Sequence, residues 1–101
     1  MPRLALETPH TIGQEEAARR LKKKVAAVRA IHGDRVNNLH EEWQDHTLSF
    51  AFQTMGMSVS GTVAVESDRV KLDASLPFAA IMFKGMIEQQ IRKEMDGLLT
   101  P

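Results

Sequence analysis

The chain has 101 residues, with 13 acidic and 13 basic side chains, no cysteine and no tyrosine. A chain of this length fits one domain, expected over residues 1–101, with one modest hydrophobic core. The absence of cysteine excludes disulfides and thiolate metal sites. The balanced charge neither favours nor excludes a nucleic-acid partner, and the scarcity of aromatic residues counts against base stacking, so nucleic acid is not expected as a partner. No apolar run has the length of a signal peptide or a membrane span, so we expect a cytoplasmic protein with no transmembrane segment.

The first forty residues predict a strand and then a helix. Leu4 and Leu6 alternate with polar neighbours before a proline, which is typical of a short strand at a sheet edge. A helix is expected over residues 12–32, with a capping box between Thr11 and Gln14 and with Gly33 as a stop. One stripe of apolar residues at helical spacing is expected to pack inward, namely Ala17, Ala18, Leu21, Val25, Val28 and Ile31.

The outward face of this helix is basic. Its candidate contact residues for an anionic partner are Arg19, Arg20, Lys22 and Lys23. Runs of this kind usually form a solvated helix face, and acidic residues in the first turn partly neutralise this one. The sequence leaves both interpretations open, a solvated face and a basic contact surface.

From Val36 onward the apolar period changes to two, which predicts an antiparallel meander over residues 36–76. The opposite face of these strands is rich in serine and threonine and can meet water. Three strands share one apolar face, made of Leu48, Phe50 and Phe52, then Met57, Val59, Gly61, Val63 and Val65, then Val70, Leu72, Ala74 and Leu76.

Local signals inside the meander indicate its turns and irregularities. The stretch around residues 36–43 breaks the alternation, so an edge strand or a bulge is expected there. Gly61 is expected to mark a bulge or a close backbone approach. Hairpin turns are predicted at Gln44-Asp45, Met55-Gly56 and Ser67-Asp68.

A second helix is expected after the sheet. Pro77 suits its first position, and the helix is predicted to end near Met95 or Asp96, with Gly97 as a left-handed cap. Its first half is apolar nearly all round, whereas one sheet face covers only one stripe. The surplus is covered by the same chain, by a homodimer contact, or by an external apolar surface or ligand. The candidate apolar interaction surface consists of Phe78, Met82, Phe83 and Met86.

These elements predict an α+β fold with two layers. An antiparallel sheet of four to five strands is covered on one face by two helices, in the order strand, helix, four strands, helix. The four histidines lack the spacing of metal ligands, and Gly56-Met57-Ser58-Val59-Ser60 lacks the final glycine of a nucleophile elbow. No catalytic, cofactor-binding or metal-binding residue emerges, so we expect a protein that is not an enzyme.

Several short motifs also follow one another in a characteristic order. They are His10-Thr11-Ile12-Gly13, Glu15-Glu16-Ala17, Trp43 before Leu48-x-Phe50, Gly56, Val59-x-Gly61-x-Val63-x-Val65, Val70-x-Leu72 and Leu76-Pro77. In this order the chain resembles the polyhydroxyalkanoic acid system family, also called the polyhydroxyalkanoate granule region family. The resemblance implies a bacterial protein linked to synthesis, storage or use of polyhydroxyalkanoate, with some members at the granule surface. It carries over no catalytic residue.

Two functional hypotheses follow. In the first, the protein is a non-enzymatic accessory protein of polyhydroxyalkanoate storage, docked on the granule or on a granule coat protein through its apolar helix surface. In the second, it is a carrier for a small hydrophobic ligand of acyl type, with the sheet gripping the last helix around a cavity. That cavity would be lined by Trp43, Phe50, Phe52 and Phe78.

Overall fold

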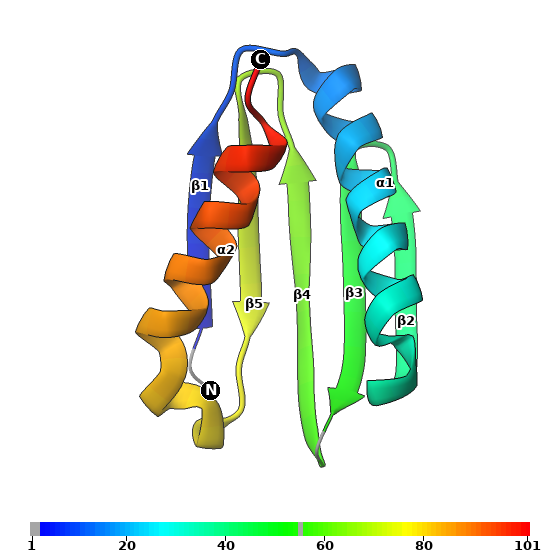
Figure 1. The fold of residues 1–101 in the computed structure, drawn as a ribbon, viewed down its shortest axis with the longest axis vertical. Helices are drawn as coiled ribbons and strands as arrows, with labels where there is room; N and C mark the ends of the chain where they lie inside the picture. The colour runs from blue at the N-terminus through cyan, green and yellow to red at the C-terminus, as the bar shows by residue number, and fades with distance from the viewer. Residues whose placement is uncertain (1–2, 55) are drawn as a thin grey trace.

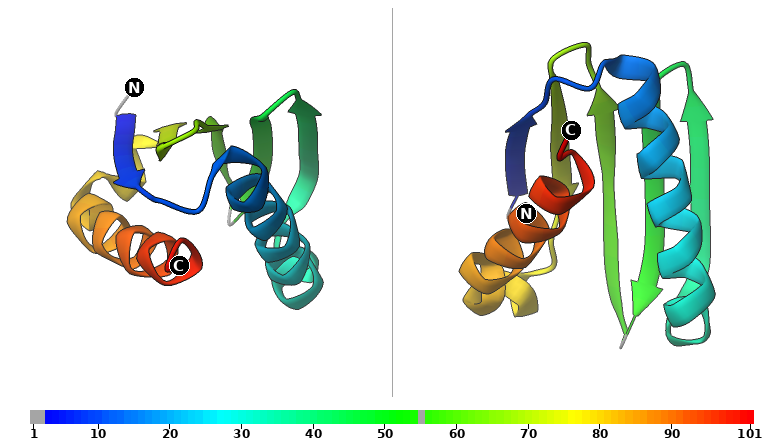
Figure 2. Two further views of the ribbon diagram at one scale, coloured as in Figure 1. Left: turned by 90° about the horizontal axis from the view of Figure 1, so that it is seen from above. Right: turned by 45° about the horizontal axis from the view of Figure 1, so that its top comes forward.

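A computed structural model describes residues 3–54 and 56–101 of the chain. Its elements are β1 (Arg3–Pro9), α1 (Gln14–His32), the 3-10 turn η1 (Gly33–Arg35), β2 (Asn37–Gln44), β3 (Thr47–Thr54), β4 (Met57–Val65), β5 (Arg69–Ser75), the 3-10 helix η2 (Phe78–Phe83) and α2 (Lys84–Leu98). One five-stranded sheet in the order β1-β5-β4-β3-β2 carries both helices on the same face (Figures 1 and 2). The predicted α+β fold and its order of elements are confirmed.

The meander over residues 36–76 forms as expected. Strands β2 to β5 pair in sequence and antiparallel, and β1 completes the sheet by pairing with β5 at its edge. Leu48 lies opposite Val63, and Val63 lies opposite Leu72, so one apolar face runs without a break across three strands. A slip of one residue would have moved these side chains to the other face, so their common burial fixes the register.

The predicted irregularities also occur. The register of β2 against β3 shifts between Asn37 and His40, and Asn38 has a φ of 53° there, which is the expected bulge in an edge strand. Asp45 (φ 56°) and Gly56 (φ 76°) occupy two of the predicted hairpin turns. Met55, the other residue of the second turn, lies outside the described residues.

Gly61 marks a close backbone approach. It lies in the middle of β4 between Phe50 of β3 and Ala74 of β5. A Cβ atom at this position would lie 2.8 Å from the Ala74 Cα atom and would also overlap the Asp73 carbonyl oxygen. Glycine is therefore required here by space, since its φ is not positive.

Helix α1 starts differently from the prediction and ends at the predicted residue. It begins at Gln14, after Gly13 with a φ of 86°, and no side chain caps it, so the expected capping box is wrong. The side-chain amide of Gln14 instead donates from Nε2 to the Val65 carbonyl oxygen at 2.8 Å. This hydrogen bond joins the start of the helix to the end of β4. The helix ends at His32 as predicted, but Gly33 is right-handed (φ −60°) and leads into η1.

The second helical segment also begins and ends differently. Pro77 has an extended conformation (ψ 156°), so it precedes the helical segment instead of opening it. A six-residue 3-10 helix follows, and the α-helix starts only at Lys84. Gly97 lies inside α2 and has no positive φ, because continuing the helix carries Leu98 and Leu99 into the core.

Two clusters of buried side chains hold the helices on the sheet. The first joins the start of α1 to the residues at the end of α2 across β3, β4 and β5, and the second lies beneath α2 on β1 and β5. The two helices are closest where α1 begins and α2 ends, and they diverge toward the other end of the sheet (Figures 1 and 2). We call these the converging end and the diverging end.

The divergence leaves part of the predicted α1 stripe outside the core. Ala17, Ala18 and Leu21 are buried as expected, but Val28 is 45 % exposed and Ile31 is 68 % exposed. The prediction of one continuous buried stripe is wrong for the second half of the helix.

Candidate interaction surface

The sequence after Pro77 produces an exposed apolar segment because of its helix type. In a 3-10 helix, residues three apart lie above one another, so a six-residue segment presents three short rows of side chains. In the row of Ala80 and Phe83, Ala80 packs on the cluster beneath α2, whereas Phe83 stays exposed. The other two rows carry Phe78 with Ile81 and Ala79 with Met82, and their large side chains stay exposed.

The four residues of the predicted apolar interaction surface are all exposed. The exposed fractions are 72 % for Phe78, 87 % for Met82, 54 % for Phe83 and 67 % for Met86. Ile81, at 50 %, belongs to the same surface and escaped the sequence analysis, although the 3-10 spacing from Phe78 could have indicated it. The explanation that the rest of the chain covers this helix is therefore wrong.

Helix α1 adds apolar residues at the same end of the molecule. Val28 and Ile31 lie in its last turns, which end at the diverging end, as η2 does (Figure 1). The sequence analysis missed these two residues as candidates because their spacing is also that of a core stripe. The diverging end thus exposes large apolar side chains from both helical segments.

The predicted basic surface of α1 is largely engaged within the chain. Arg19 binds Glu16 with an Nε–Oε1 distance of 2.6 Å. Arg20 donates from Nη1 to the carbonyl oxygen of Leu98 at 3.1 Å, and to that of Thr100. This guanidinium therefore ties the start of α1 to the carbonyl end of α2.

The two lysines of the predicted basic surface differ from each other. The Lys22 ammonium lies 5.0 Å from the centroid of the Trp43 ring, within cation–π range. Lys23 is exposed and has no carboxylate partner among the residues that the structure describes. Its neighbour Lys24 binds Glu94 of α2 at 2.9 Å, so this ion pair joins the middle of α1 to α2.

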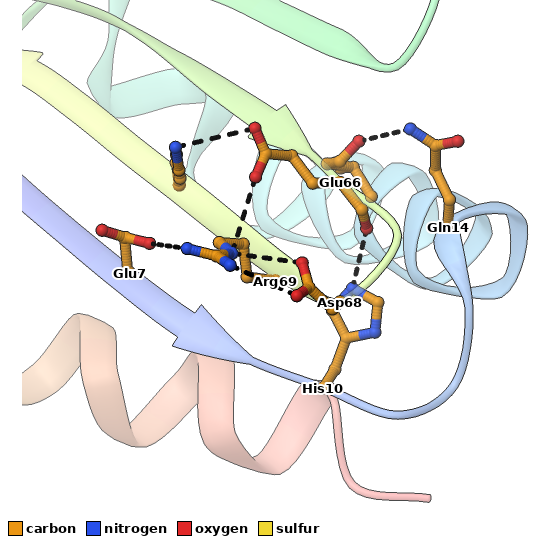
Figure 3. Close-up of polar contacts among 8 residues, drawn as sticks. Glu7, His10, Gln14, Glu66, Asp68 and Arg69 are labelled. Carbon is orange, nitrogen blue, oxygen red and sulfur yellow. Dashed lines mark hydrogen bonds and ion pairs between the residues drawn. The ribbon is translucent and has the colours of Figure 1, made fainter.

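A polar cluster closes the converging end of β1 and β5 (Figure 3). Arg69 lies within 3.1 Å of both Glu7 and Asp68, and its hydrogen bond to Asp68 holds the pKa of that carboxyl below its usual value. His10 is buried and its Nε2 lies 3.0 Å from the Glu66 carbonyl oxygen, while its Nδ1 has no partner in the chain as described. These contacts pin the connections at the ends of β1 and β4.

The structure brings no metal-binding group together in the residues it describes. No set of three or more His, Asp or Glu side chains there could hold an ion. His46 binds Glu15 at 2.7 Å and joins the β2–β3 turn to the start of α1, whereas His32 and His40 are exposed. His10 is buried but lies in the loop after β1.

The residues expected to line an acyl cavity are not arranged around one space. Phe50 and Phe52 stack with centroids 6.3 Å apart, and Phe50 packs on both core clusters, whereas Phe78 is exposed on η2. Two open depressions lie elsewhere. One of about 560 Å³ is on the polar sheet face beside Thr62 and Asp73, and one of about 360 Å³ lies beside His10 and Asp96. The carrier hypothesis stays a prediction without a cavity to support it.

Comparison with known proteins decides the family. The model of a family described as "Putative polyhydroxyalkanoic acid system protein" matches residues 4–99, which is nearly the whole chain. The chain belongs to this family. The predicted resemblance is confirmed, and this member of the polyhydroxyalkanoic acid system family is a small α+β domain with an apolar surface on η2 and α2.

The other comparisons add little to the family assignment. No curated protein matches the chain. The crystal structure of TTHA0849 from Thermus thermophilus is similar over 97 % of this chain and 92 % of that one, with 14 % identity and a TM-score of 0.42, and such a score supports no conclusion here. Within residues 3–54 and 56–101, no helix of this family member is long and apolar enough to cross a membrane.

Proposed function

We propose that this polyhydroxyalkanoic acid system protein is a non-enzymatic accessory protein of polyhydroxyalkanoate storage that docks on the granule surface. The observation that carries the proposal is the exposed apolar surface of η2 and α2, defined by Phe78, Met82, Phe83 and Met86. The family description supplies the link to the polymer.

The chemistry of this surface suits a polymer. Large apolar residues scattered singly over a surface are normal, whereas a large contiguous group of them generally marks a binding surface. A water-insoluble polyester offers methylene and methyl groups with no regular pattern of hydrogen-bond donors, so shape-adaptable side chains serve better than a preformed polar site. Met82 and Met86 are unbranched and flexible, which fits such a contact.

Sedimentation with polymer granules tests the proposal. The purified protein is mixed with polyhydroxyalkanoate granules freed of their own proteins, and bound and free fractions are separated by centrifugation. The unaltered protein is expected to sediment with the granules. The double variant Phe83→Ser, Met86→Ser is expected to stay in the supernatant while keeping its unfolding temperature, because both side chains are already exposed.

Leu39→Ser is the matched control. Leu39 is a large apolar residue, 37 % exposed, on β2 at the opposite edge of the sheet from β1 and α2. Its replacement is expected to leave sedimentation unchanged. A protein that forms a stable dimer through η2 and α2 and ignores the stripped granules would contradict the proposal, as would equal loss of binding in the control. Binding only to granules that retain their own proteins would replace the polymer by a coat protein as the partner.

A further inference from the structure

Two of the four residues on the apolar interaction surface are methionines. Met82 is 87 % exposed and Met86 is 67 % exposed, so a small reagent in solution can reach both side chains in the free protein. Among the large apolar residues exposed in the described part of the chain, Met82 has the largest exposed fraction. The contact surface therefore presents oxidisable sulfur to the solvent.

The other methionines that the structure describes are less accessible. Met57 and Met95 are both partly buried, and Met95 packs against the first core cluster. The chain has no cysteine, so no thiol within the protein competes for an oxidant. Susceptibility of methionine to oxidation follows exposure, so Met82 and Met86 are expected to react before Met57 and Met95.

We infer that Met82 and Met86 are sites of reversible oxidation, and that their oxidation turns off the apolar contact of η2 and α2. Hydrogen peroxide transfers one oxygen atom to the thioether sulfur. The S–O bond forms as the O–O bond breaks, sulfur supplies the two electrons, and the leaving hydroxide takes the proton of the transferred oxygen and departs as water. This regulation rests on the proposed function, which supplies the granule contact.

The product of this step is poorly suited to contact with a polyester. Methionine sulfoxide carries a polar S=O group, which is a hydrogen-bond acceptor. A polyester chain presents ester oxygens, which are also acceptors, so the sulfoxide would be buried there without a donor. In the free protein water supplies that donor, because both side chains are exposed. Oxidation therefore opposes the contact and leaves the fold intact.

Peroxide treatment followed by granule sedimentation tests the inference with the intact chain. The protein is treated with hydrogen peroxide and freed of it, and the oxidation of each methionine is measured by peptide mass spectrometry. The two exposed methionines are expected to oxidise ahead of Met57 and Met95. At the dose that oxidises the exposed pair, binding to stripped polyhydroxyalkanoate granules is expected to weaken about tenfold or more, because burial of a methionine side chain is worth about that factor. The unfolding temperature should stay the same.

Two double variants and a reversal make the result specific. Met82→Leu, Met86→Leu keeps apolar side chains of similar volume and removes the sulfur, so its sedimentation is expected to be the same before and after peroxide. Met57→Leu, Met95→Leu retains both exposed methionines and is expected to lose binding on oxidation. The two methionine sulfoxide reductases, one for each sulfoxide epimer, should restore binding of the oxidised protein.

The outcomes separate this inference from the proposed function. Equal sedimentation of the unaltered protein before and after oxidation would overturn the inference and uphold granule docking. Equal loss on oxidation in the Met82→Leu, Met86→Leu variant would also overturn it, since other methionines would then be responsible.

An unoxidised protein that ignores the granules would overturn the proposed function. Binding of the apolar dye Nile red to the same samples then tests the oxidation separately. Loss of dye binding on oxidation in the unaltered protein, but not in Met82→Leu, Met86→Leu, would support these two residues as the sites that turn off the apolar surface. Dye binding that survives oxidation would overturn the inference.

Discussion

The two ends of helix α1 face the same sheet and have opposite environments. At the converging end, Ala17 and Leu21 are buried and Arg20 joins the helix to the last carbonyl groups of α2. At the diverging end, Val28 and Ile31 are exposed on a helix that has separated from its neighbour. The difference shows that helical spacing alone does not determine burial, because a partner must also be close enough to cover the stripe. One end holds the fold, and the other is left available for contact.

The largest loss of stability should come from truncating a buried side chain at the converging end. Leu21→Ala removes a side chain that is 6 % exposed and packed in the first core cluster, so a loss of about 2–5 kcal/mol in the free energy of unfolding is expected. Ile31→Ala, the matched change at the other end of the same helix, is expected to alter it by about 0.5 kcal/mol or less. Urea denaturation followed by circular dichroism measures both.

Equal losses in these two variants would contradict the comparison. They would mean that Ile31 is covered in solution, by a second copy or by a closer approach of α1 to the sheet. A protein concentration series distinguishes these two cases, because only a dimer makes the midpoint of unfolding depend on concentration.

The next effect concerns the sheet that both ends share. Gly61→Ala places a methyl group against the Ala74 backbone of the neighbouring strand, where a Cβ atom would lie only 2.8 Å from the Ala74 Cα atom. The sheet must shift to accept it, and overpacking of this kind costs about 1–3 kcal/mol. Chemical denaturation checks the value. An unchanged midpoint would show that β4 and β5 separate more readily than their register suggests.

A smaller loss of stability is expected when the hydrogen bonds between the start of α1 and the end of α2 are removed. Arg20→Ala removes the donor that reaches the Leu98 and Thr100 carbonyl oxygens, and a loss of about 1–2 kcal/mol is expected, since the guanidinium is charged and partly buried. Arg19→Ala on the neighbouring exposed position is the control, and its loss should be smaller. Faster amide exchange at the end of α2 in the Arg20 variant alone would locate the effect.

Most of the sheet could be predicted from the sequence. Alternation of apolar residues, from Leu48 through Val63 to Leu72, predicts three strands and their shared face, because a buried face admits only one register. The bulge near Asn38 and the close approach at Gly61 were also predictable, since each is a local departure from that pattern. The four exposed residues of η2 and α2 follow from an apolar surplus that one sheet cannot cover.

The sequence does not predict which contact forms where a local one and a tertiary one compete. Gln14 suits a capping box, but its side chain donates to Val65 of β4 instead. Gly97 suits the end of a helix, but the helix continues past it and Leu99 is buried. The exposure of Val28 and Ile31 depends on the angle between two helices that are far apart in the chain. No periodicity within α1 carries that information.

The smallest expected effect is electrostatic. It tests whether protonation of Glu16 at low pH lowers the stability of the converging end. The hydrogen bond from Arg19, with smaller contributions from Arg20, lowers the pKa of Glu16 from an ordinary 4.5 to about 2. Since the folded pKa is the lower one, the carboxylate stabilises the fold fully above about pH 4.5, and this stabilisation is lost as the pH falls toward 2.

Glu16→Gln should therefore lower the unfolding temperature slightly at pH 7, and its difference from the unaltered protein should shrink between about pH 4.5 and pH 2. Thermal unfolding over this pH range measures it. Glu88→Gln near the diverging end is the control, because the ion pair of Glu88 with Lys84 is long, at 4.0 Å, so its difference should stay small throughout. If the two variants respond alike to acid, the ion pairs near the start of α1 do not stabilise the converging end, and the difference between the two ends of α1 depends on apolar packing alone.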